Sequence, residues 1–484
     1  MLPVLTPDEM GAADARTIAA GTPVEVLMER AGRAVAWVVR TRLRGLYGRR
    51  AVVVCGKGNN GGDGVIAARV LRHWGARVDE FHLETGVPRV ELARALARAD
   101  VVVDAMYGTG FRGELEGDAR AVAETLRDFD GSVIAVDIPS GVQGLTGEVR
   151  GIAVRADDTV CFAAHKPGLL FEPGRSLAGR VHVVDLGIAV DDLARAWATE
   201  AADVASWLVP RAADAHKWRA GCFVVGGSGG MTGAPSLVSH AAMRSGAGIV
   251  WCGVPGAEAA ARLSGSEVIA KALPATPDGF LGDGAAKDVL DDLERFRALA
   301  VGPGLGRSPA TAAAVRRIVA AARVPVVIDA DGLHAVGDDP ALLRIRSAPT
   351  ILTPHEGEYA SLRGGPPGPD RLAAARALAT DTGAIVLLKG PGTVVAAPDG
   401  RARICSTGGP WLATAGTGDV LTGVIAGLLA RGLEPFDAAS AGAFVHGLAA
   451  DVAGHTGLMA GDLVAAIPAV LVDLTRDPAP DAVR

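Results

Sequence analysis

The sequence predicts an α/β protein made of two tandem domains, each built on a parallel sheet covered by helices. The chain has 484 residues, whereas a domain has about 150 residues, so two or three domains are expected. Short β-branched runs alternate with helical patterns in both halves of the chain, which favours parallel strands connected by helices. The alternation stops after residue 188 and restarts at Cys222. We therefore predict an N-terminal domain at 1–200 and a C-terminal domain at 201–484.

The individual elements follow from the apolar runs and their flanking glycines and prolines. In the first half, strands are predicted at 51–55, 101–104, 132–137, 159–163 and 181–184, and helices at 22–40 and 65–74. In the second half, strands are predicted at 222–225, 249–252, 299–301, 326–329, 350–352 and 384–388, and helices at 419–429, 437–454 and 460–474.

Composition limits the classes of partner. Hydrophobic residues make up 49% of the chain and charged residues 21%, which is typical of globular proteins and excludes general disorder. The net charge of −6 comes without long charged runs, so neither a nucleic acid nor a membrane surface is expected as a partner. Five scattered cysteines and no visible secretory signal fit reduced thiols in a cytoplasmic enzyme that acts on small molecules.

A glycine-rich turn is the first candidate binding feature. GKGNNGGDG at 56–64 follows a predicted strand and opens a helix, so its backbone N–H groups suit a phosphate or pyrophosphate. Its spacing is not the GxGxxG pattern of hydride-transferring Rossmann domains, and a purely structural turn is an equal alternative. Polar side chains that we expect to meet at the carboxyl ends of the strands are Asn60, Asp63, Asp104, Asp137 and Ser140; the alternative role for the carboxylates is to cap loops.

Five motifs in the first 190 residues resemble the NAD(P)H-hydrate epimerase family. They are LMERAG at 27–32, the glycine-rich turn at 56–64, DAMYGTGFRG at 104–113, VDIPSG at 136–141 and HKPG at 165–168. The resemblance implies a Rossmann-like parallel-sheet sandwich. It implies that hydrated NAD(P)H binds to Asn59, Asn60, Gly61, Gly62, Asp63, Gly108, Thr109, Gly110, Phe111, Arg112, Gly113, Glu114 and Asp137, with K⁺ held by Asn60, Asp104 and Ser140.

The chemistry of that substrate indicates which side chains react. C6 of the hydrated nicotinamide carries a hydroxyl beside the ring nitrogen, so its inversion needs reversible loss of hydroxide or ring opening, and both need acid–base help. Asp137 is our candidate acid or base. Lys166 is expected to stabilise negative charge or bind a phosphate, and the alternative is a solvent-exposed loop lysine.

The second half carries glycine-rich turns at strand ends and one helix start with a carboxylate. The turns are GGSGGMTGA at 226–234, VGPGLG at 301–306 and TPHEGE at 353–358, where we expect His355 to contact ligand. In AGTGD at 415–419, backbone amides at a helix N-terminus stand next to Asp419. This arrangement suits phosphoryl transfer, in which amides stabilise charge and a carboxylate accepts a hydroxyl proton. The alternative is that Asp419 only caps the helix.

These motifs, with KGPGT at 389–393 and DAHK at 214–217, resemble the NAD(P)H-hydrate dehydratase branch of the ribokinase-like superfamily. The resemblance covers about 205–484 and implies a ribokinase-like domain. It implies that Ala234, Gly304, His355 and Asp419 contact hydrated NAD(P)H, and that Lys389, Gly390, Pro391, Gly392, Thr393, Gly416, Thr417 and Gly418 contact ADP or AMP. One departure is Trp218, which stands where a glycine commonly follows DAHK and leaves the local turn in doubt.

Fused in this order, the two halves resemble the bifunctional NAD(P)H-hydrate repair family. The resemblance implies epimerisation of R and S NADHX and NADPHX. It also implies dehydration of the S epimer at the expense of ADP, which gives AMP and phosphate. K⁺ and Mg²⁺ are the expected ions, and a homo-oligomer is expected. Two alternatives remain: a ribokinase-like small-molecule kinase with a nucleotide-binding regulatory domain, and an N-terminal half that binds a nucleotide without catalysis.

Overall fold

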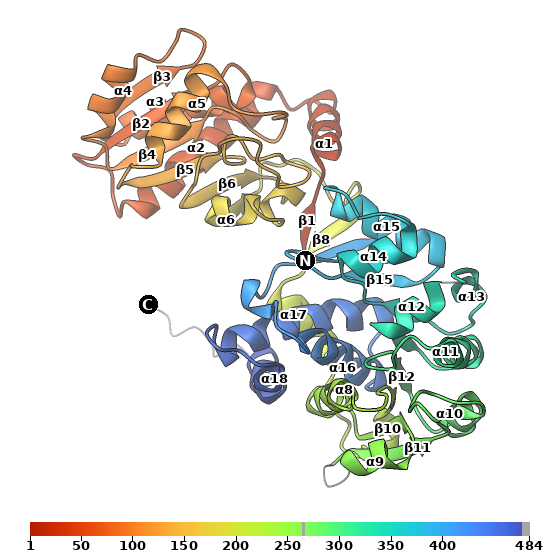
Figure 1. The fold of residues 1–484 in the computed structure, drawn as a ribbon. Coiled ribbons are helices and arrows are strands. Elements are labelled where there is room, and N and C mark those ends of the chain that lie inside the picture. Colours follow the sequence, from red (N-terminus) through yellow and green to blue (C-terminus); the bar gives the residue numbers. More distant parts are fainter. Residues whose placement is uncertain (264–266, 338, 477–484) are drawn as a thin grey trace. The chain divides into compact units, whose positions relative to one another are not determined.

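The chain divides into two compact units in the computed structural model, which describes residues 1–263, 267–337 and 339–476 (Figure 1). One unit is Leu2–Trp197, and the other is Met1 with Ala198–Arg484. The predicted boundary between residues 200 and 201 lies close to this division. The last part of the predicted C-terminal domain, 477–484, lies outside the described residues.

The first unit has a parallel sheet in the order β3-β2-β4-β5-β6-β7. Its strands are β2 (Arg50–Cys55), β3 (Arg77–His82), β4 (Val101–Ala105), β5 (Ser132–Val136), β6 (Asp158–Phe162) and β7 (Arg180–Val184). The continuous valine-rich runs form strands that are buried on both faces, as is typical of a parallel sheet covered by helices. β3 was not predicted, because its residues, RVDEFH, mix polar and apolar side chains on an edge that is only partly buried.

Helices cover both faces of this sheet. Val53 packs in one core with α2 (Val24–Arg42) and α3 (Asn59–His73), whereas Val52 and Val54 pack in another with α4 (Arg89–Leu96) and α5 (Gly117–Leu126). The helix predicted at 65–74 begins earlier, because the second part of the glycine-rich segment is already helical. Gly61 permits this start, since a Cβ there would lie 2.0 Å from the carbonyl oxygen of Gly56.

Shorter elements complete the unit. They are β1 (Leu2–Val4), α1 (Pro7–Ala19), the 3₁₀ turn η1 (Pro167–Leu169), α6 (Gly174–Ala178) and β8 (Ala196–Ala198), which reaches the division. The sequence analysis missed α1, although its start is encoded locally. Thr6 accepts a hydrogen bond from the Glu9 backbone and the Glu9 side chain accepts one from the Thr6 backbone, which is a capping box.

The second unit contains the strand order β17-β16-β15-β14-β13-β12-β9-β10-β11. The strands are β9 (Gly221–Val225), β10 (Ile249–Pro255), β11 (Ile269–Leu273), β12 (Ala298–Val301), β13 (Val326–Ile328), β14 (Thr350–Leu352), β15 (Ile385–Leu388), β16 (Thr393–Ala396) and β17 (Ala402–Cys405). Pairing is parallel from β11 to β15, and β16 and β17 add an antiparallel end. β11, β16 and β17 were not predicted. β11 is a partly buried edge strand, and β16 and β17 are buried four-residue strands in the antiparallel part of the sheet.

Four helices bury one face of this sheet in a shared core: α8 (Gly233–Arg244), α16 (Thr417–Ala430), α17 (Pro435–Ala453) and α18 (Ala460–Thr475). The remaining elements are α7 (Ala201–Trp207), η2 (Lys217–Ala220), α9 (Ala257–Arg262), α10 (Ala285–Leu293), α11 (Pro309–Ala321), α12 (Asp331–Gly337), α13 (Ala341–Arg344), α14 (Glu356–Arg363), α15 (Arg371–Thr382) and η3 (Pro410–Leu412). Among the described residues, no helix is both long and apolar enough to cross a bilayer.

Candidate active sites

A cavity of about 520 Å³ opens in the first unit, next to the carboxyl ends of β2, β4 and β5. Predicted site residues that line it are Asn59, Asn60, Asp63, Gly108, Thr109, Gly110, Phe111, Asp137 and Lys166. Gly61 and Gly62 lie in the same turn of α3 but outside the lining, and so do Arg112, Gly113 and Glu114. Three residues of α1 also line the cavity: Met10, Asp14 and Ile18. These three residues were not predicted to line a site, because helix α1 itself was not predicted.

Asp137 and Lys166 form a buried ion pair at the cavity. Asp137 follows β5 in a left-handed conformation with a φ of 65°, a strained state for a non-glycine residue that commonly marks a functional site. Lys166 Nζ lies 2.7 Å from Asp137 Oδ1, and the other carboxylate oxygen accepts a hydrogen bond of 3.0 Å from the Thr109 backbone. Both oxygens of Asp137 are therefore held in place.

Lys166 is wholly enclosed. Its side chain is 1% exposed, so the solvent-exposed alternative for this lysine is wrong. Besides Asp137, its ammonium donates to the carbonyl oxygen of Phe162 at 2.8 Å and to Cys161 Sγ at 3.5 Å. Burial alone would lower the pKa of Lys166, but the charge of Asp137 raises it well above its usual value. Lys166 thus stays a cation that faces Asp137.

Asp104 and Ser140 contact each other in the buried interior. The Asp104 carboxylate accepts hydrogen bonds from the Ser140 backbone at 2.8 Å, from Ser140 Oγ at 2.6 Å and from the Met106 backbone at 3.2 Å. Burial raises the pKa of Asp104 to about 6, although these hydrogen bonds oppose the shift. The alternative role of Asp104, a loop cap, accounts for its hydrogen bonds to the backbones of Met106 and Ser140. It does not account for the complete burial of a carboxylate.

Asn60 lies next to the same strand ends. A Cβ on Gly108 would be 3.0 Å from Asn60 Oδ1 and 3.2 Å from Asp137 Oδ2, so a larger residue would crowd these two side chains. Asn60 Nδ2 is buried and has no hydrogen-bond partner among the described residues. Amide, carboxylate and hydroxyl oxygens of Asn60, Asp104 and Ser140 are donors that suit a hard cation, so the residues present fit K⁺.

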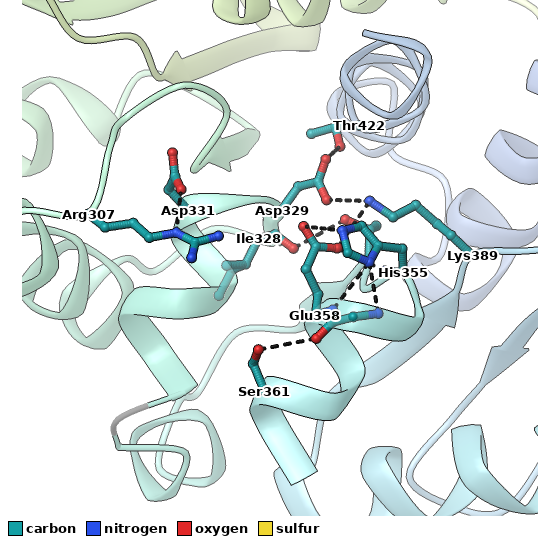
Figure 2. A network of polar contacts seen from close by, with 11 residues as sticks. Arg307, Ile328, Asp329, Asp331, His355, Glu358, Ser361, Lys389 and Thr422 are labelled. Atoms are coloured by element: carbon teal, nitrogen blue, oxygen red, sulfur yellow. Dashed lines mark hydrogen bonds and ion pairs between the residues drawn. The ribbon is translucent and has the colours of Figure 1, made fainter. Parts of the chain in front are cut away.

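The second unit brings four side chains from four elements into one polar network, drawn in Figure 2. Asp329 follows β13, Glu358 lies on α14, Lys389 follows β15 and Thr422 lies on α16. Lys389 Nζ is 2.9 Å from Asp329 Oδ1 and 3.4 Å from Glu358 Oε2. Thr422 Oγ1 donates to Asp329 Oδ2 at 2.7 Å.

The charges in this network stabilise one another. Burial raises the pKa of Asp329, but the Lys389 charge and the hydrogen bonds from Lys389, Thr422 and Thr353 hold it below its usual value. Burial lowers the pKa of Lys389, but Asp329 and Glu358 raise it above its usual value. Lys389 was predicted as a site residue, whereas Asp329, Glu358 and Thr422 were not. The available signal was an aspartate directly after a buried strand, the same one that identified Asp137.

Asp419 lies in the first turn of α16, near this network. The N-cap of α16 is Gly416, with a φ of 88° and no side-chain cap, so the alternative that Asp419 caps the helix is wrong. Burial raises the pKa of Asp419 to about 6, and the charges of Asp329 and Glu358 add to this shift while Lys389 opposes it. A Cβ on Gly418 would be 3.6 Å from Lys389 Nζ, which places the start of α16 beside the lysine.

Two other predicted contacts of hydrated NAD(P)H lie together. A Cβ on Gly304 would be 3.4 Å from Ala234 Cβ, and Gly304 has a φ of 69°, so this tight loop needs glycine. His355 is the N-cap of α14, where its Nδ1 accepts hydrogen bonds from the Gly357 and Glu358 backbones at 3.0 and 3.2 Å. Only Nε2 of His355 therefore remains for a ligand, and it lies 3.5 Å from Glu358.

The predicted nucleotide loop follows β15. Arg371 holds its start, since Nη2 of Arg371 donates to the Lys389 carbonyl oxygen at 2.9 Å. Gly390 has a φ of 147°, and a Cβ there would lie 2.4 Å from Arg371 Nη2. Pro391 and Gly392 follow Gly390, and Thr393 opens β16.

At the start of α16, Thr417 Oγ1 donates to the carbonyl oxygens of Leu412 and Thr414, at 2.8 and 2.9 Å. Its hydroxyl therefore shapes the loop.

Trp218, which stands where a glycine commonly follows DAHK, packs into an aromatic cluster. Trp218 lies in η2 and packs edge-to-face against Trp251 and Phe296, with ring centroids 6.2 and 5.5 Å apart. The guanidinium of Arg295 lies 4.1 Å from the Trp218 ring centroid. The large side chain in place of glycine thus fills an aromatic cluster beside β9 and β10, and the chain after DAHK forms a 3₁₀ turn.

Comparisons with known proteins agree on both units. Residues 222–468 match the family model described as NAD(P)H-hydrate dehydratase, and residues 24–98 and 83–168 match the YjeF-related protein N-terminus. The chain of the ribokinase-like superfamily protein from Enterococcus faecalis shares the fold of the second unit, with a TM-score of 0.51 and 20% identity, over 58% of this chain and 96% of that one. This match supports the predicted ribokinase-like fold.

Whole-chain relatives are curated under one name, bifunctional NAD(P)H-hydrate repair enzyme. The protein from Moorella thermoacetica is 40% identical over 94% of both chains. The protein from Salinibacter ruber is 39% identical over 97% of this chain and 96% of its own, and that from Escherichia coli is 34% identical over 93% and 90%. The chain therefore belongs to the family of bifunctional NAD(P)H-hydrate repair enzymes.

Proposed function

We propose that this chain repairs hydrated NADH and NADPH by two reactions in two separate units. The first unit interconverts the R and S hydrates, and the second dehydrates the S hydrate at the expense of ADP, which yields AMP and phosphate. The observation that carries the proposal is the pairing, in each unit, of a buried lysine with a carboxylate at the carboxyl ends of the parallel strands. The whole-chain identity to repair enzymes supports the same assignment.

In epimerisation, Asp137 exchanges a proton with the hydroxyl on C6 of the hydrated ring. The Lys166 ammonium and the Thr109 amide fix the carboxylate, so Lys166 is a positioning residue, and a phosphate-binding role is disfavoured because its donors are already used. The nucleotide lies along the turn at 59–63 and the loop at 108–114, in which Phe111, Gly108 and Gly110 line the cavity. Arg112, Gly113 and Glu114 would then contact the part of the nucleotide outside the cavity.

K⁺ would be held by Asn60, Asp104 and Ser140 and would neutralise the buried Asp104 charge next to the anionic substrate. Replacing K⁺ by tetramethylammonium should slow epimerisation, and Asp104→Ala should remove both most of the activity and the K⁺ dependence. An unchanged rate in K⁺-free buffer would contradict this ligand set.

In dehydration, Asp419 takes the proton of the C6 hydroxyl, whose oxygen attacks the terminal phosphorus of ADP. The bond between that phosphorus and the bridging oxygen breaks, and AMP leaves. The C6–O bond of the phosphate ester then breaks and phosphate leaves with the electron pair, C5 loses a proton to water, and the resulting C5=C6 double bond restores the dihydronicotinamide. The backbone N–H groups of Gly416 and Gly418 at the helix N-terminus would stabilise the transferred phosphoryl group, whereas the Thr417 N–H donates to the Thr414 carbonyl oxygen at 3.3 Å.

The remaining predicted contact residues would position the two nucleotides. Ala234, Gly304 and Nε2 of His355 border the hydrated nicotinamide nucleotide, and the loop at 389–393 borders the adenine nucleotide. Mg²⁺ would neutralise the ADP phosphates. The ligands of Mg²⁺ would come mainly from phosphates and water, because both carboxylate oxygens of Asp329 already bind Lys389 and Thr422.

The test is incubation of the purified chain with mixed R and S NADHX and with ADP or ATP. In the presence of ADP, dihydronicotinamide absorbance should return and both epimers should disappear. AMP and phosphate should appear as products. A small-molecule kinase would instead leave a stable phosphorylated product and no regained absorbance. A homo-oligomer stays a prediction, and size-exclusion chromatography with light scattering would check it.

A further inference from the structure

A second carboxyl group, Asp63, faces the epimerase cavity. It lies in α3, is 7% exposed and lines the cavity, yet its carboxyl makes no hydrogen bond or ion pair with any other described residue. Asp137 differs, because Lys166 and the Thr109 amide engage both of its oxygens. An enclosed but unpartnered carboxyl that lines a cavity is available to whatever enters it.

A third carboxyl, Asp14 on α1, lines the same cavity. Burial raises the pKa of Asp63 to about 8, and the negative charges of Asp137 and Asp14 add to the shift. Burial also raises the pKa of Asp14, with Lys166 opposing and Asp137 adding to it. Asp63 is therefore mainly a neutral acid at pH 7, whereas Asp137 in the same cavity is held in an ion pair with Lys166.

The surroundings of Asp63 leave few other sources of charge. Ionisable residues that line the cavity besides the three carboxyls are Lys57, Tyr107 and Lys166, and α2 lines it only with Val24, Leu27, Met28 and Ala31. The strands that α3 packs against carry ionisable side chains that do not line the cavity: Arg50 and Cys55 on β2, Arg77, Asp79, Glu80 and His82 on β3, and Asp104 on β4, with none on β5. Lys166 is committed to Asp137, so the balance of charge around Asp63 keeps a proton on it.

We propose that Asp63 is the general acid of epimerisation, that Asp14 helps to keep it protonated, and that Asp137 is the complementary base. This inference rests on the proposed epimerase function and assigns a second catalytic residue to the same site. Two carboxyl groups whose surroundings place one in the acid form and the other in the base form are the usual arrangement for acid–base catalysis at neutral pH.

Asp63 gives its proton to the C6 oxygen, the C6–O bond breaks with its electron pair on oxygen, and water leaves while the ring nitrogen lone pair forms a C6=N double bond. Water then adds to the other face of C6, its proton passes to Asp137, and the nitrogen regains its lone pair. Asp63 recovers a proton and Asp137 releases one through cavity water. The reverse conversion exchanges the two roles.

The first measurement is the epimerisation rate of the wild-type chain from pH 6 to pH 9.5, corrected for the uncatalysed rate and followed by chromatographic separation of the R and S hydrates. A required acid predicts a rate that falls about tenfold per pH unit above about pH 8. Asp63→Asn should lower the rate at pH 7 by about 10²- to 10⁴-fold and abolish this alkaline fall. Asp14→Asn should move the fall to lower pH, because a negative charge near Asp63 is lost.

The matched control is Asp79→Asn, which removes an exposed carboxylate from β3 of the same unit and should leave the profile unchanged. A wild-type rate with the alkaline fall retained in Asp63→Asn would overturn the inference, and so would an unmoved fall in Asp14→Asn. If thermal unfolding shows that Asp63→Asn does not fold, the wild-type and Asp14→Asn profiles decide. A wild-type chain that does not epimerise at any pH contradicts the proposed function itself, which is a distinguishable result.

Discussion

The two candidate sites use the same components in different arrangements. In the first unit the buried lysine, Lys166, pairs with the candidate base Asp137, and the unpartnered carboxyl is Asp63. In the second unit the buried lysine, Lys389, pairs with Asp329 and Glu358, and the carboxyl outside the pair is the candidate base Asp419. A buried lysine alone therefore does not identify the reacting carboxylate.

Burial is the largest cause of the raised pKa of both unpaired carboxyls, and the neighbouring charges differ between them. Negative charges of Asp137 and Asp14 add to burial at Asp63, whose pKa rises to about 8. At Asp419 the positive charge of Lys389 opposes burial and the negative neighbours, and the pKa rises only to about 6. At pH 7 the first carboxyl is mainly protonated and the second mainly ionised, so similar components yield an acid in one unit and a base in the other.

The largest expected effect separates the two reactions. Asp419→Asn keeps the side-chain shape and removes the proton acceptor, so dehydration should fall by about 10²- to 10⁴-fold. Epimerisation should stay within about twofold, since the sites lie in separate compact units. Dihydronicotinamide absorbance and chromatography of both hydrates measure the two rates. Asp283→Asn, an exposed carboxylate of the same unit, is the control, and restored absorbance at the wild-type rate in Asp419→Asn would exclude its role as base.

The converse variant is Asp137→Asn. With ADP present, the S hydrate should disappear at the wild-type rate, whereas the R hydrate should decline only as fast as it inverts spontaneously. The same chromatographic time course records both epimers. Clearance of the R hydrate at the wild-type rate would show that Asp137 is not required.

A smaller effect concerns stability of the second unit. Lys389→Met leaves Asp329 buried without its partner charge, which should lower the free energy of unfolding by about 3–5 kcal/mol. Lys287→Met, which breaks an exposed ion pair with Asp291 in the same unit, should leave the free energy of unfolding nearly unchanged, because solvent screens that pair. Urea unfolding monitored by tryptophan fluorescence compares the two. Equal effects would mean that the buried network does not hold the unit together.

Most of the fold could be predicted, because both sheets have apolar strands at their centres. The missed strands are of two kinds. β3 and β11 lie at the edges of their sheets, where partial burial no longer imposes an apolar pattern, whereas β16 and β17 are buried strands of only four residues each that pair antiparallel. Motif residues such as Asp137 and Asp419 were found because each follows or opens an element at the carboxyl ends of the strands. Asp14 and Glu358 were missed because each reaches its site from a helix, and only the packing of that helix brings it there.

The smallest effect is a pH shift that compares the two sites directly. As a base, Asp419 must be ionised, so the dehydration rate should fall about tenfold per pH unit below about pH 6, whereas epimerisation should fall above about pH 8. Glu358→Gln removes a negative charge that raises the pKa of Asp419 and frees Lys389 from one partner. Both changes lower the pKa of Asp419, so the acid fall of dehydration should move to lower pH by a fraction of a unit. The alkaline fall of epimerisation in the same variant is the internal control and should stay in place. A dehydration profile that does not move, or moves to higher pH, would mean that the acid fall belongs to a group other than Asp419.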